Sequence, residues 1–213
     1  HTLFCLLPFE KKWFMDRGVK KVISIAHPLF KKHQAALEKV SRKKTDVKTL
    51  LLLPGSRKSE IKFLFPKFLE AARLLKDRYG IKVEMVKASS LPAEYFIAGE
   101  GIIDYFHPAA DLEIALEKAD MTFAASGTVT LSCALFSVPS VVCYGATLLE
   151  QFIFKQFVNY EGDISLGNII HQERIFPEIL GDRVNVNELV KRAELWISNK
   201  DVFQEVVAKL DKT

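Results

Sequence analysis

The segment Leu50-Leu51-Leu52-Leu53-Pro54-Gly55-Ser56-Arg57 decides the fold, because an apolar strand ends there in a sharp turn and a charged amphipathic helix follows. Pro54 and Gly55 force the turn, and Ser56 can cap the next helix. Arg57 offers a planar fork of donors that matches a phosphate group. Open α/β sheets bind anionic ligands at such turns, so the segment predicts a phosphate-binding loop. The alternative is an ordinary turn whose arginine faces solvent.

The composition is that of an ordinary folded protein. Of 213 residues, 49% are hydrophobic and 26% are charged, and the formal net charge of +4 comes from interspersed charges of both signs. Disorder is not expected, and neither is nucleic acid as a partner. No apolar run reaches the roughly 20 residues that span a bilayer, and no signal-peptide pattern occurs, which favours a cytoplasmic protein.

Neither a metal site nor a cofactor is expected. The cysteines are odd in number and lie in strand or helix contexts, which predicts buried, reduced thiols at Cys5, Cys133 and Cys143. Four of the histidines are too scattered to form a paired helical ligand set: His27, His33, His107 and His171.

Strands and helices alternate from residue 47 onward, which predicts a Rossmann-like, doubly wound parallel sheet of the α/β class. The expected strands are 48–53, 81–87, 102–106, 121–124 and 140–144, and the expected helices are 58–79, 110–118 and 128–136. One face of the 58–79 helix is expected in the core, through Ile61, Leu64, Phe65, Phe68, Leu69, Ala72 and Leu75. Two or three helices should close the chain.

The first 46 residues give a second set of expectations. Residues 2–7 read as a fully buried strand, followed by a short helix at 9–16, a strand at 22–25, a helix at 29–40 and a polar boundary at 41–46. Buried parallel strands rarely open a domain without partners before them, so the chain is expected to begin inside a domain.

Ala124-Ala125-Ser126-Gly127-Thr128 is a second candidate anion loop, because it follows a strand and precedes a helix. It brings backbone N–H groups, two hydroxyls and a helix N-terminus to one point, which suits a diphosphate. The alternative is that Ser126 or Thr128 simply caps the helix. Both loops follow strands of one sheet, so we expect them to converge. No G-x-G-x-x-G or Walker sequence occurs, which disfavours hydride transfer and ATP hydrolysis.

Five strings resemble those of bacterial lipid-A-disaccharide synthase in order and context, over roughly residues 3–180. They are Leu6-Leu7-Pro8-Phe9-Glu10, His27-Pro28-Leu29, Leu52-Leu53-Pro54-Gly55-Ser56-Arg57 with Glu60-Ile61, Ala125-Ser126-Gly127-Thr128 with Thr130-Leu131, and Ser165-Leu166 with Asn168. The resemblance implies the C-terminal half of a glycosyltransferase B architecture. Residues 1–40 would end the N-terminal Rossmann-like domain and form the interdomain connection, 47–180 would form the C-terminal UDP-sugar-binding domain, and 181–213 would form C-terminal helices.

The resemblance also implies an activity. An inverting glycosyltransferase would move 2,3-diacylglucosamine from its UDP donor onto 2,3-diacylglucosamine 1-phosphate, forming the β-1,6-linked lipid A disaccharide. Arg57 would stabilise the leaving group, and UDP would contact Ser56, Arg57, Glu60, Ser126, Gly127, Thr128 and Asn168. The general base would lie upstream of residue 1, so the isolated chain is expected to turn over negligibly. The implied partners are the UDP-diacylglucosamine donor, the acylated sugar phosphate acceptor, the inner face of the inner membrane as a peripheral surface, and a homodimer partner.

Three departures from the family pattern stand out. Ser132 replaces a glutamate that reaches the ribose hydroxyls in related transferases, and Gly145 replaces an arginine or lysine. The stretch Glu161-Gly162-Asp163 is about one residue longer than usual, and Gly167 follows it in place of a residue such as proline or alanine. The open alternatives are another UDP-sugar transferase or epimerase of this fold, or a non-catalytic nucleotide-binding fragment. Apolar residues at 152–158 would form a membrane-facing edge or, as we favour, pack against the C-terminal helices.

Overall fold

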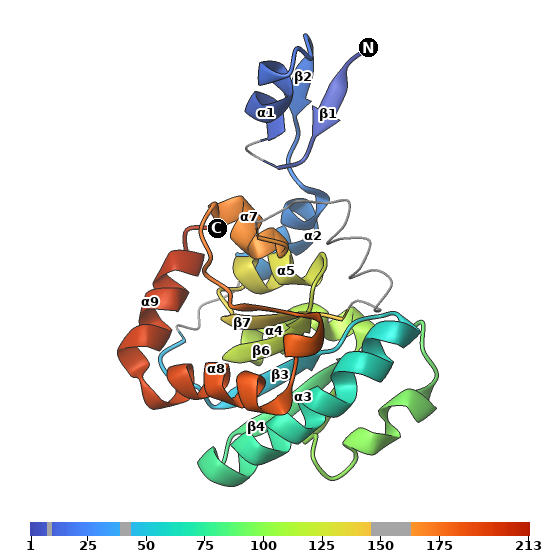
Figure 1. Ribbon diagram of the computed structural model, residues 1–213, viewed down its shortest axis with the longest axis vertical. Coiled ribbons are helices and arrows are strands. Elements are labelled where there is room, and N and C mark those ends of the chain that lie inside the picture. The colour runs from blue at the N-terminus through green and yellow to red at the C-terminus, as the bar shows by residue number, and fades with distance from the viewer. Residues whose placement is uncertain (8–9, 39–43, 146–162) are drawn as a thin grey trace.

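Six parallel strands form the central sheet of the computed structural model, which describes residues 1–7, 10–38, 44–145 and 163–213 (Figure 1). The strand order is β5-β4-β3-β6-β7-β8. The strands are β3 (Thr49–Leu53), β4 (Lys82–Lys87), β5 (Tyr105–Pro108), β6 (Met121–Ala125), β7 (Ser140–Tyr144) and β8 (Glu178–Leu180). The chain winds outward from β3 in one direction and from β6 in the other, so the predicted doubly wound sheet is confirmed.

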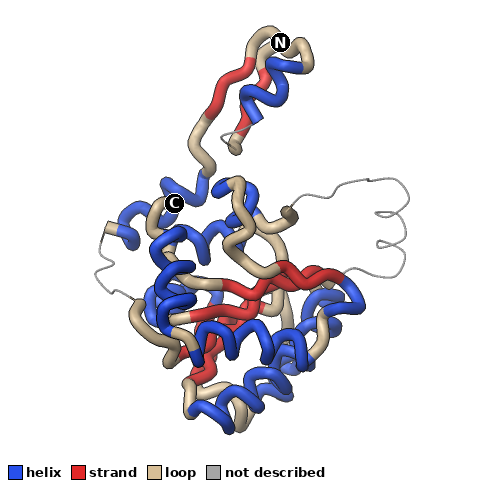
Figure 2. Tube along the Cα trace, turned by 60° about the vertical axis from the view of Figure 1, so that its left-hand side comes forward, coloured by secondary structure: helices blue, strands red, loops and turns tan. Residues whose placement is uncertain are grey.

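Helices cover both faces of the sheet, which explains why β3, β6 and β7 are almost entirely buried (Figure 2). The core on one face includes residues of α3 (Lys58–Tyr79), η1 (Ala93–Gly99), α8 (Val186–Ser198) and α9 (Lys200–Leu210). The core on the other face includes residues of α4 (Leu112–Lys118), which follows η2 (Ala109–Asp111), of α5 (Val129–Leu135) and of α2 (Pro28–Leu37). Two further elements, α7 (Leu166–His171) and η3 (Gly181–Arg183), flank β8.

Helix α3 begins and ends at the predicted residues. Its seven predicted core side chains are all buried, with at most 5% of the surface of any of them exposed. Gly80 ends the helix in the left-handed conformation, with φ of 64°. The periodicity of apolar residues therefore located the longest helix correctly.

Two strands of the central sheet differ from expectation. Strand β5 begins at Tyr105 instead of residue 102, because Ile102 and Ile103 lie in a turn whose N–H groups donate to the Gly99 carbonyl. Strand β8 was not predicted, since it is only three residues long and directly follows Pro177. The expected apolar edge at 152–158 and the insertion at 161–162 lie outside the described residues.

The N-terminal strands form a separate two-stranded parallel sheet of β1 (Leu3–Cys5) and β2 (Val22–Ser24), joined by α1 (Glu10–Asp16). This unit projects from the rest of the molecule (Figure 1). The prediction of a fully buried first strand is wrong here: Phe4 is 60% exposed and its partner Ile23 is 39% exposed. In the described part of the chain, the face with Cys5 and Val22 is buried, whereas no element covers the face with Phe4 and Ile23.

The three thiols are free and buried, as predicted. Among the helices that the structure describes, none combines the length and apolar character needed to cross a membrane.

Candidate functional site

The two predicted anion loops meet at the point where the winding direction of the sheet reverses. Strands β3 and β6 are neighbours, and Leu53 pairs with Ala124, so both loops leave the sheet at the same edge. They border a cavity of about 410 Å³. Six of the seven predicted ligand-binding residues line it: Ser56, Arg57, Glu60, Ser126, Gly127 and Thr128. The rest of its lining is largely apolar and includes Val86 near the end of β4 and Leu112 at the start of α4.

The first loop is closed by its own carboxylate. Glu60 Oε2 accepts hydrogen bonds from the backbone N–H groups of Ser56 at 3.1 Å and Arg57 at 3.2 Å, and Oε1 accepts from the Arg57 guanidinium at 3.1 Å. Ser56 was expected to cap α3, but the N-cap residue is Arg57 and the carboxylate of Glu60 takes the N–H groups. Because these N–H groups are engaged, the loop offers an anion chiefly the Arg57 guanidinium, whose side chain is 80% exposed.

Gly55 allows Glu60 to approach the loop. Its φ is +103°, which side chains rarely adopt, and a Cβ atom there would lie 2.3 Å from Glu60 Oε2. The glycine thus allows both the backbone conformation of the turn and the close approach of the Glu60 carboxylate.

The second loop keeps free donors. Gly127 has φ of +151°, and the Thr130 hydroxyl fixes the turn by donating to the Gly127 carbonyl at 2.8 Å. The N–H groups of Gly127 and Thr128 donate no hydrogen bond to any residue that the structure describes. The Thr128 side chain at the N-cap of α5 makes no capping hydrogen bond with the described residues. The alternative that Ser126 or Thr128 simply caps this helix is therefore not observed. Two N–H groups are therefore available to an anion at the N-terminal end of α5.

A smaller cavity of about 70 Å³ adjoins the first and reaches the end of β7. Arg57, Glu60 and Ser126 line both cavities. Gly145 lies at its far side, where a Cβ atom would approach the Phe63 ring to 2.7 Å. A larger side chain at this position would thus displace Phe63.

Lys67 supplies a cation near this end of the site. Its Nζ lies 3.2 Å from the centroid of the Phe63 ring and donates to the Phe63 carbonyl at 3.0 Å. Burial lowers the pKa of Lys67, and nearby Cys143 and Asp182 oppose that effect.

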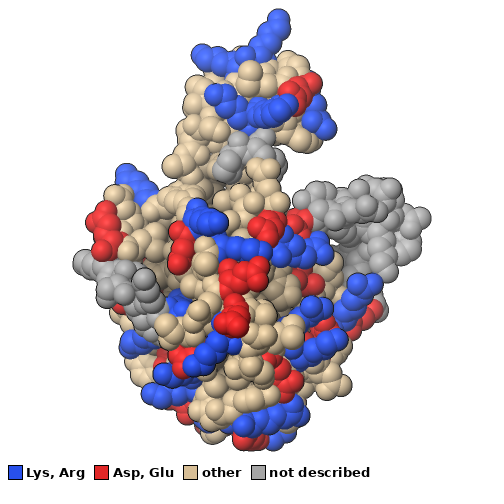
Figure 3. Space-filling view, turned by 90° about the vertical axis from the view of Figure 1, so that its left-hand side faces the viewer, with Lys and Arg blue, Asp and Glu red and all other residues tan. Residues whose placement is uncertain are grey.

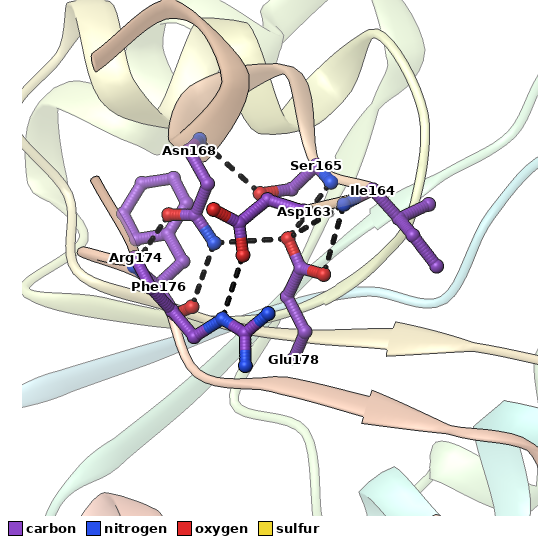
Figure 4. Close-up of polar contacts among 7 residues, drawn as sticks. All are labelled: Asp163, Ile164, Ser165, Asn168, Arg174, Phe176 and Glu178. Carbon is purple, nitrogen blue, oxygen red and sulfur yellow. Dashed lines mark hydrogen bonds and ion pairs between the residues drawn. The ribbon is translucent and has the colours of Figure 1, made fainter. Parts of the chain in front are cut away.

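Asn168 does not join the other predicted residues. It is fully buried, and its amide donates to the Phe176 carbonyl and to Glu178, each at 2.9 Å, while its oxygen accepts from the Phe176 N–H at 2.7 Å (Figure 4). Phe176 lies in the segment between α7 and β8, and Glu178 is the first residue of β8. The structure therefore gives Asn168 a scaffold position instead of the predicted contact with nucleotide.

Glu178 is the hub of that scaffold, and sequence reasoning missed it. Its carboxylate accepts from the N–H groups of Ile164 and Ser165 and from the Asn168 amide, with a shortest distance of 2.8 Å (Figure 4). The Asp163 carboxylate beside it pairs with Arg174 at 2.6 Å, which raises the pKa of that guanidinium. A lone glutamate after a proline carries no motif, so only the fold reveals this role.

Ser132 also lies away from the cavity lining. Its hydroxyl is buried and lies 2.9 Å from Nε2 of His33, while Nδ1 of His33 lies 2.7 Å from Glu113. Ser132, where the resemblance implies a glutamate, thus contributes to the packing of α2 against α5.

The arrangement suits binding of a phosphorylated ligand. The residues that line the cavity include Arg57, with its guanidinium, and Gly127 and Thr128, with their two backbone N–H groups. The other walls can receive a base and a sugar. Among the described residues, Glu60 is the only one in the lining that carries a carboxylate, and the loop already engages it. Within the described ranges, no three His, Cys, Asp or Glu side chains are grouped as metal ligands.

Comparison with solved structures shows the same fold in sugar-nucleotide enzymes. A Listeria monocytogenes protein assigned as a UDP-N-acetylglucosamine 2-epimerase matches 97% of the chain and 53% of its own, with a TM-score of 0.66 and 18% identity. The UDP-GlcNAc 2-epimerase of Methanocaldococcus jannaschii matches 100% of the chain and 62% of its own, with a TM-score of 0.54 and 14% identity. At these identities the likeness concerns the fold, which is the C-terminal half of a glycosyltransferase B architecture.

Sequence comparison identifies the family. The model of the lipid-A-disaccharide synthetase family matches residues 1–212. The lipid-A-disaccharide synthase of Campylobacter jejuni (strain RM1221) is 35% identical over 218 residues, covering 98% of the chain and 55% of the relative. That of Helicobacter acinonychis (strain Sheeba) is 33% identical over 208 residues, covering 89% and 53%. The chain thus spans about half the length of these curated relatives. It belongs to the lipid-A-disaccharide synthetase family.

Proposed function

We propose that this chain is the donor-binding part of an inverting glycosyltransferase. The enzyme transfers 2,3-diacylglucosamine from UDP to 2,3-diacylglucosamine 1-phosphate and releases UDP. The observation that carries the proposal is the convergence of the loops at 54–57 and 126–128 around one cavity at the reversal point of the sheet. Family membership narrows the phosphorylated ligand to a UDP-sugar.

Each of the two loops binds one phosphate of the diphosphate. The N–H groups of Gly127 and Thr128 receive one phosphate, and the Arg57 guanidinium swings from Glu60 onto the other. That swing is feasible because an ion pair this exposed is worth little in water. The uridine then occupies the part of the cavity near Val86 and Leu112.

Arg57 has a catalytic role in this proposal. Negative charge grows on the diphosphate as the bond to the sugar breaks, so a guanidinium placed there binds the transition state more strongly than the ground state. Loss of Arg57 should therefore lower the rate as well as the affinity.

The general base belongs to residues outside this chain. The described residues of the lining include no carboxylate besides the engaged Glu60, and the curated relatives are nearly twice as long as the matched region. The isolated chain should therefore bind UDP but turn over negligibly. In the same scheme, residues 1–40 end the N-terminal Rossmann-like domain and form the interdomain connection, 47–180 bind the donor, and 181–213 form the C-terminal helices.

The acylated substrates place the enzyme at the inner face of the inner membrane as a peripheral protein. The projecting N-terminal unit supports this, because most of the charged side chains on its visible face are basic (Figure 3) and Trp13 and Met15 are about half exposed beside Lys11 and Lys12. A homodimer formed by exchange of C-terminal helices remains part of the proposal. In the present structure, α8 packs on α3 of its own chain, where Glu194 pairs with Arg78 at 2.8 Å.

Calorimetric titration with UDP tests the site. Arg57→Ala should weaken UDP binding about tenfold, in line with loss of a charge-assisted hydrogen bond. Arg73→Ala is the matched control, since Arg73 is an ion-paired arginine on the same helix that lines neither cavity at the site. Equal UDP affinity in wild type and Arg57→Ala would remove Arg57 from the site. Product analysis with a full-length protein separates transfer to the acylated acceptor from epimerisation of a UDP-sugar.

A further inference from the structure

His33 lies fully buried in the middle of α2 and joins three helices. Its Nδ1 is 2.7 Å from Glu113 Oε1 on α4, and its Nε2 is 2.9 Å from the Ser132 hydroxyl on α5. The ring also packs edge-on against Phe136, with centroids 5.5 Å apart. Both ring nitrogens are therefore used.

The chemistry of these partners fixes the ring. A carboxylate only accepts hydrogen bonds, so Nδ1 carries the proton that Glu113 accepts. In the neutral ring, Nε2 then accepts from the Ser132 hydroxyl. Glu113 thus sets the tautomer that allows His33 to hold Ser132.

The order serine, histidine, carboxylate matches that of a hydrolase triad, but the surroundings do not. Ser132 is only 2% exposed and lines neither cavity at the site. A substrate has no route to its hydroxyl, so the contacts hold structure instead of activating a nucleophile.

Helix α5 depends on such contacts for its orientation. It has seven residues, and a helix this short has little stability of its own. Thr130 ties one side of it by accepting from the Leu166 N–H at 3.1 Å and donating to the Gly127 carbonyl. Ser132 ties another side of it to α2 through His33. The loop with the free N–H groups directly precedes this helix.

We propose that His33 is a positioning residue for the loop Ser126-Gly127-Thr128. Through Ser132 it holds α5 in the orientation that aims the N–H groups of Gly127 and Thr128 at the phosphate. The identity of that ligand rests on the proposed function, whereas the link from His33 to the loop does not. Helix α2 follows the N-terminal unit in the chain, so the same contact anchors the connecting segment beside the ligand site.

Matched variants separate the two bonds of His33. His33→Gln places an amide where Nε2 was and keeps a partner for Ser132, whereas His33→Asn keeps only a partner for Glu113. Ser132→Ala removes the α5 bond alone. Thr122→Val is the control, because it deletes a buried hydroxyl bond of 2.7 Å to Ser140, in a residue that lines neither cavity at the site.

UDP titration and amide NMR of the folded variants provide the readouts, at a temperature well below each midpoint. Ser132→Ala and His33→Asn should weaken UDP binding about three- to tenfold, the range expected for one buried hydrogen bond. They should also shift the Gly127 and Thr128 amide resonances. His33→Gln and Thr122→Val should stay within about twofold of wild type.

Two results would overturn the proposal. One is unchanged amide resonances of Gly127 and Thr128 in Ser132→Ala, and the other is equal impairment of UDP binding by His33→Gln and His33→Asn. If wild type fails to bind UDP, the proposed ligand is wrong, but the amide shifts in the free protein still decide whether His33 positions the loop.

Discussion

The Glu60 carboxylate binds Arg57 twice, through the backbone N–H at 3.2 Å and through the guanidinium at 3.1 Å. The Glu60 side chain therefore engages both the N–H group at the N-terminus of α3 and the guanidinium that a phosphate would use. In the absence of ligand, Glu60 acts as the internal anion of this loop. In the proposed function, an arriving phosphate exchanges with Glu60 at the guanidinium, while the backbone contacts keep the turn in shape.

Removing this carboxylate should destabilise α3. We expect Glu60→Ala to lower stability by about 1 kcal/mol, as loss of a helix cap does, and the melting temperature by roughly 2–4 °C. Glu60→Gln keeps an acceptor and should lose less. Thermal melts check this, with Glu70→Ala as a control because Glu70 sits in an exposed pair on the same helix. A similar loss in both alanine variants would contradict the special position of Glu60.

Alanine substitutions at Gly55 and Gly80 separate the cost of backbone strain from the cost of side-chain crowding. Both have positive φ, but a Cβ atom at Gly80 would meet nothing within 4 Å, whereas one at Gly55 would strike Glu60. Gly80→Ala should therefore cost about 1 kcal/mol for backbone strain alone, and Gly55→Ala clearly more. Gly55→Ala should also weaken UDP binding, because Glu60 and Arg57 must move. Equal melting temperatures for the two variants would rule out the crowding.

Asn168 should act through stability and not through ligand contact. Asn168→Ala leaves the Phe176 backbone groups unpaired and should cost about 2 kcal/mol. Asn168→Asp should cost about 3 kcal/mol or more, because it places a carboxylate against the Phe176 carbonyl and Glu178. Denaturant melts and UDP titrations are the measurements. A drop in UDP affinity at unchanged stability would restore the predicted nucleotide contact.

The buried thiols should be inert while the protein is folded. Burial raises the pKa of Cys133 to about 11 and raises that of Cys143 as well. At pH 8 only about one Cys133 side chain in a thousand is then a thiolate. A disulfide reagent should react slowly with the folded chain and rapidly in guanidinium, where Cys133→Ala should lower the final count by one thiol. Fast reaction of Cys133 in the folded state would show that the β6–α5 region opens.

His171 should make the fold sensitive to mild acid. Its Nε2 lies 2.7 Å from the Thr213 hydroxyl, and burial lowers its pKa below the ordinary 6.5 despite the opposing charge of Glu173. Below pH 6.5 the unfolded chain therefore binds the proton more readily, and stability falls as the pH falls. The wild-type melting temperature should drop more between pH 7.5 and 5 than that of His171→Gln. Parallel curves would exclude His171 as the cause.

The sequence was sufficient to predict the elements that have a strong local pattern. Helix α3 has apolar residues at helical spacing and a glycine at its end, so its bounds were predicted to the residue. The loops at 54–57 and 126–128 were predicted to converge because each follows a buried parallel strand, and they do. These features need only local chemistry and the general rule for open sheets.

What the sequence missed depends on contacts between distant segments. The roles of Glu178 and His33 come from partners on other elements, so neither residue carried a motif. Asn168 lies in a family string, but its buried surroundings assign it to the scaffold. The exposure of Phe4 likewise depends on which layers cover the strand, which an apolar run does not reveal.

The pairing of β3 with β6 has a kinetic consequence. Leu50 lies beside Met121, while α3, β4, β5 and α4 all lie between them in the chain. Parallel pairing across so long a separation forms slowly. During refolding, the helices and other contacts between residues close in sequence should form before the cavity between the two loops exists. Recovery of UDP affinity should therefore lag behind recovery of the far-UV circular dichroism signal. A fluorescent nucleotide would therefore serve as a late reporter of assembly in this chain.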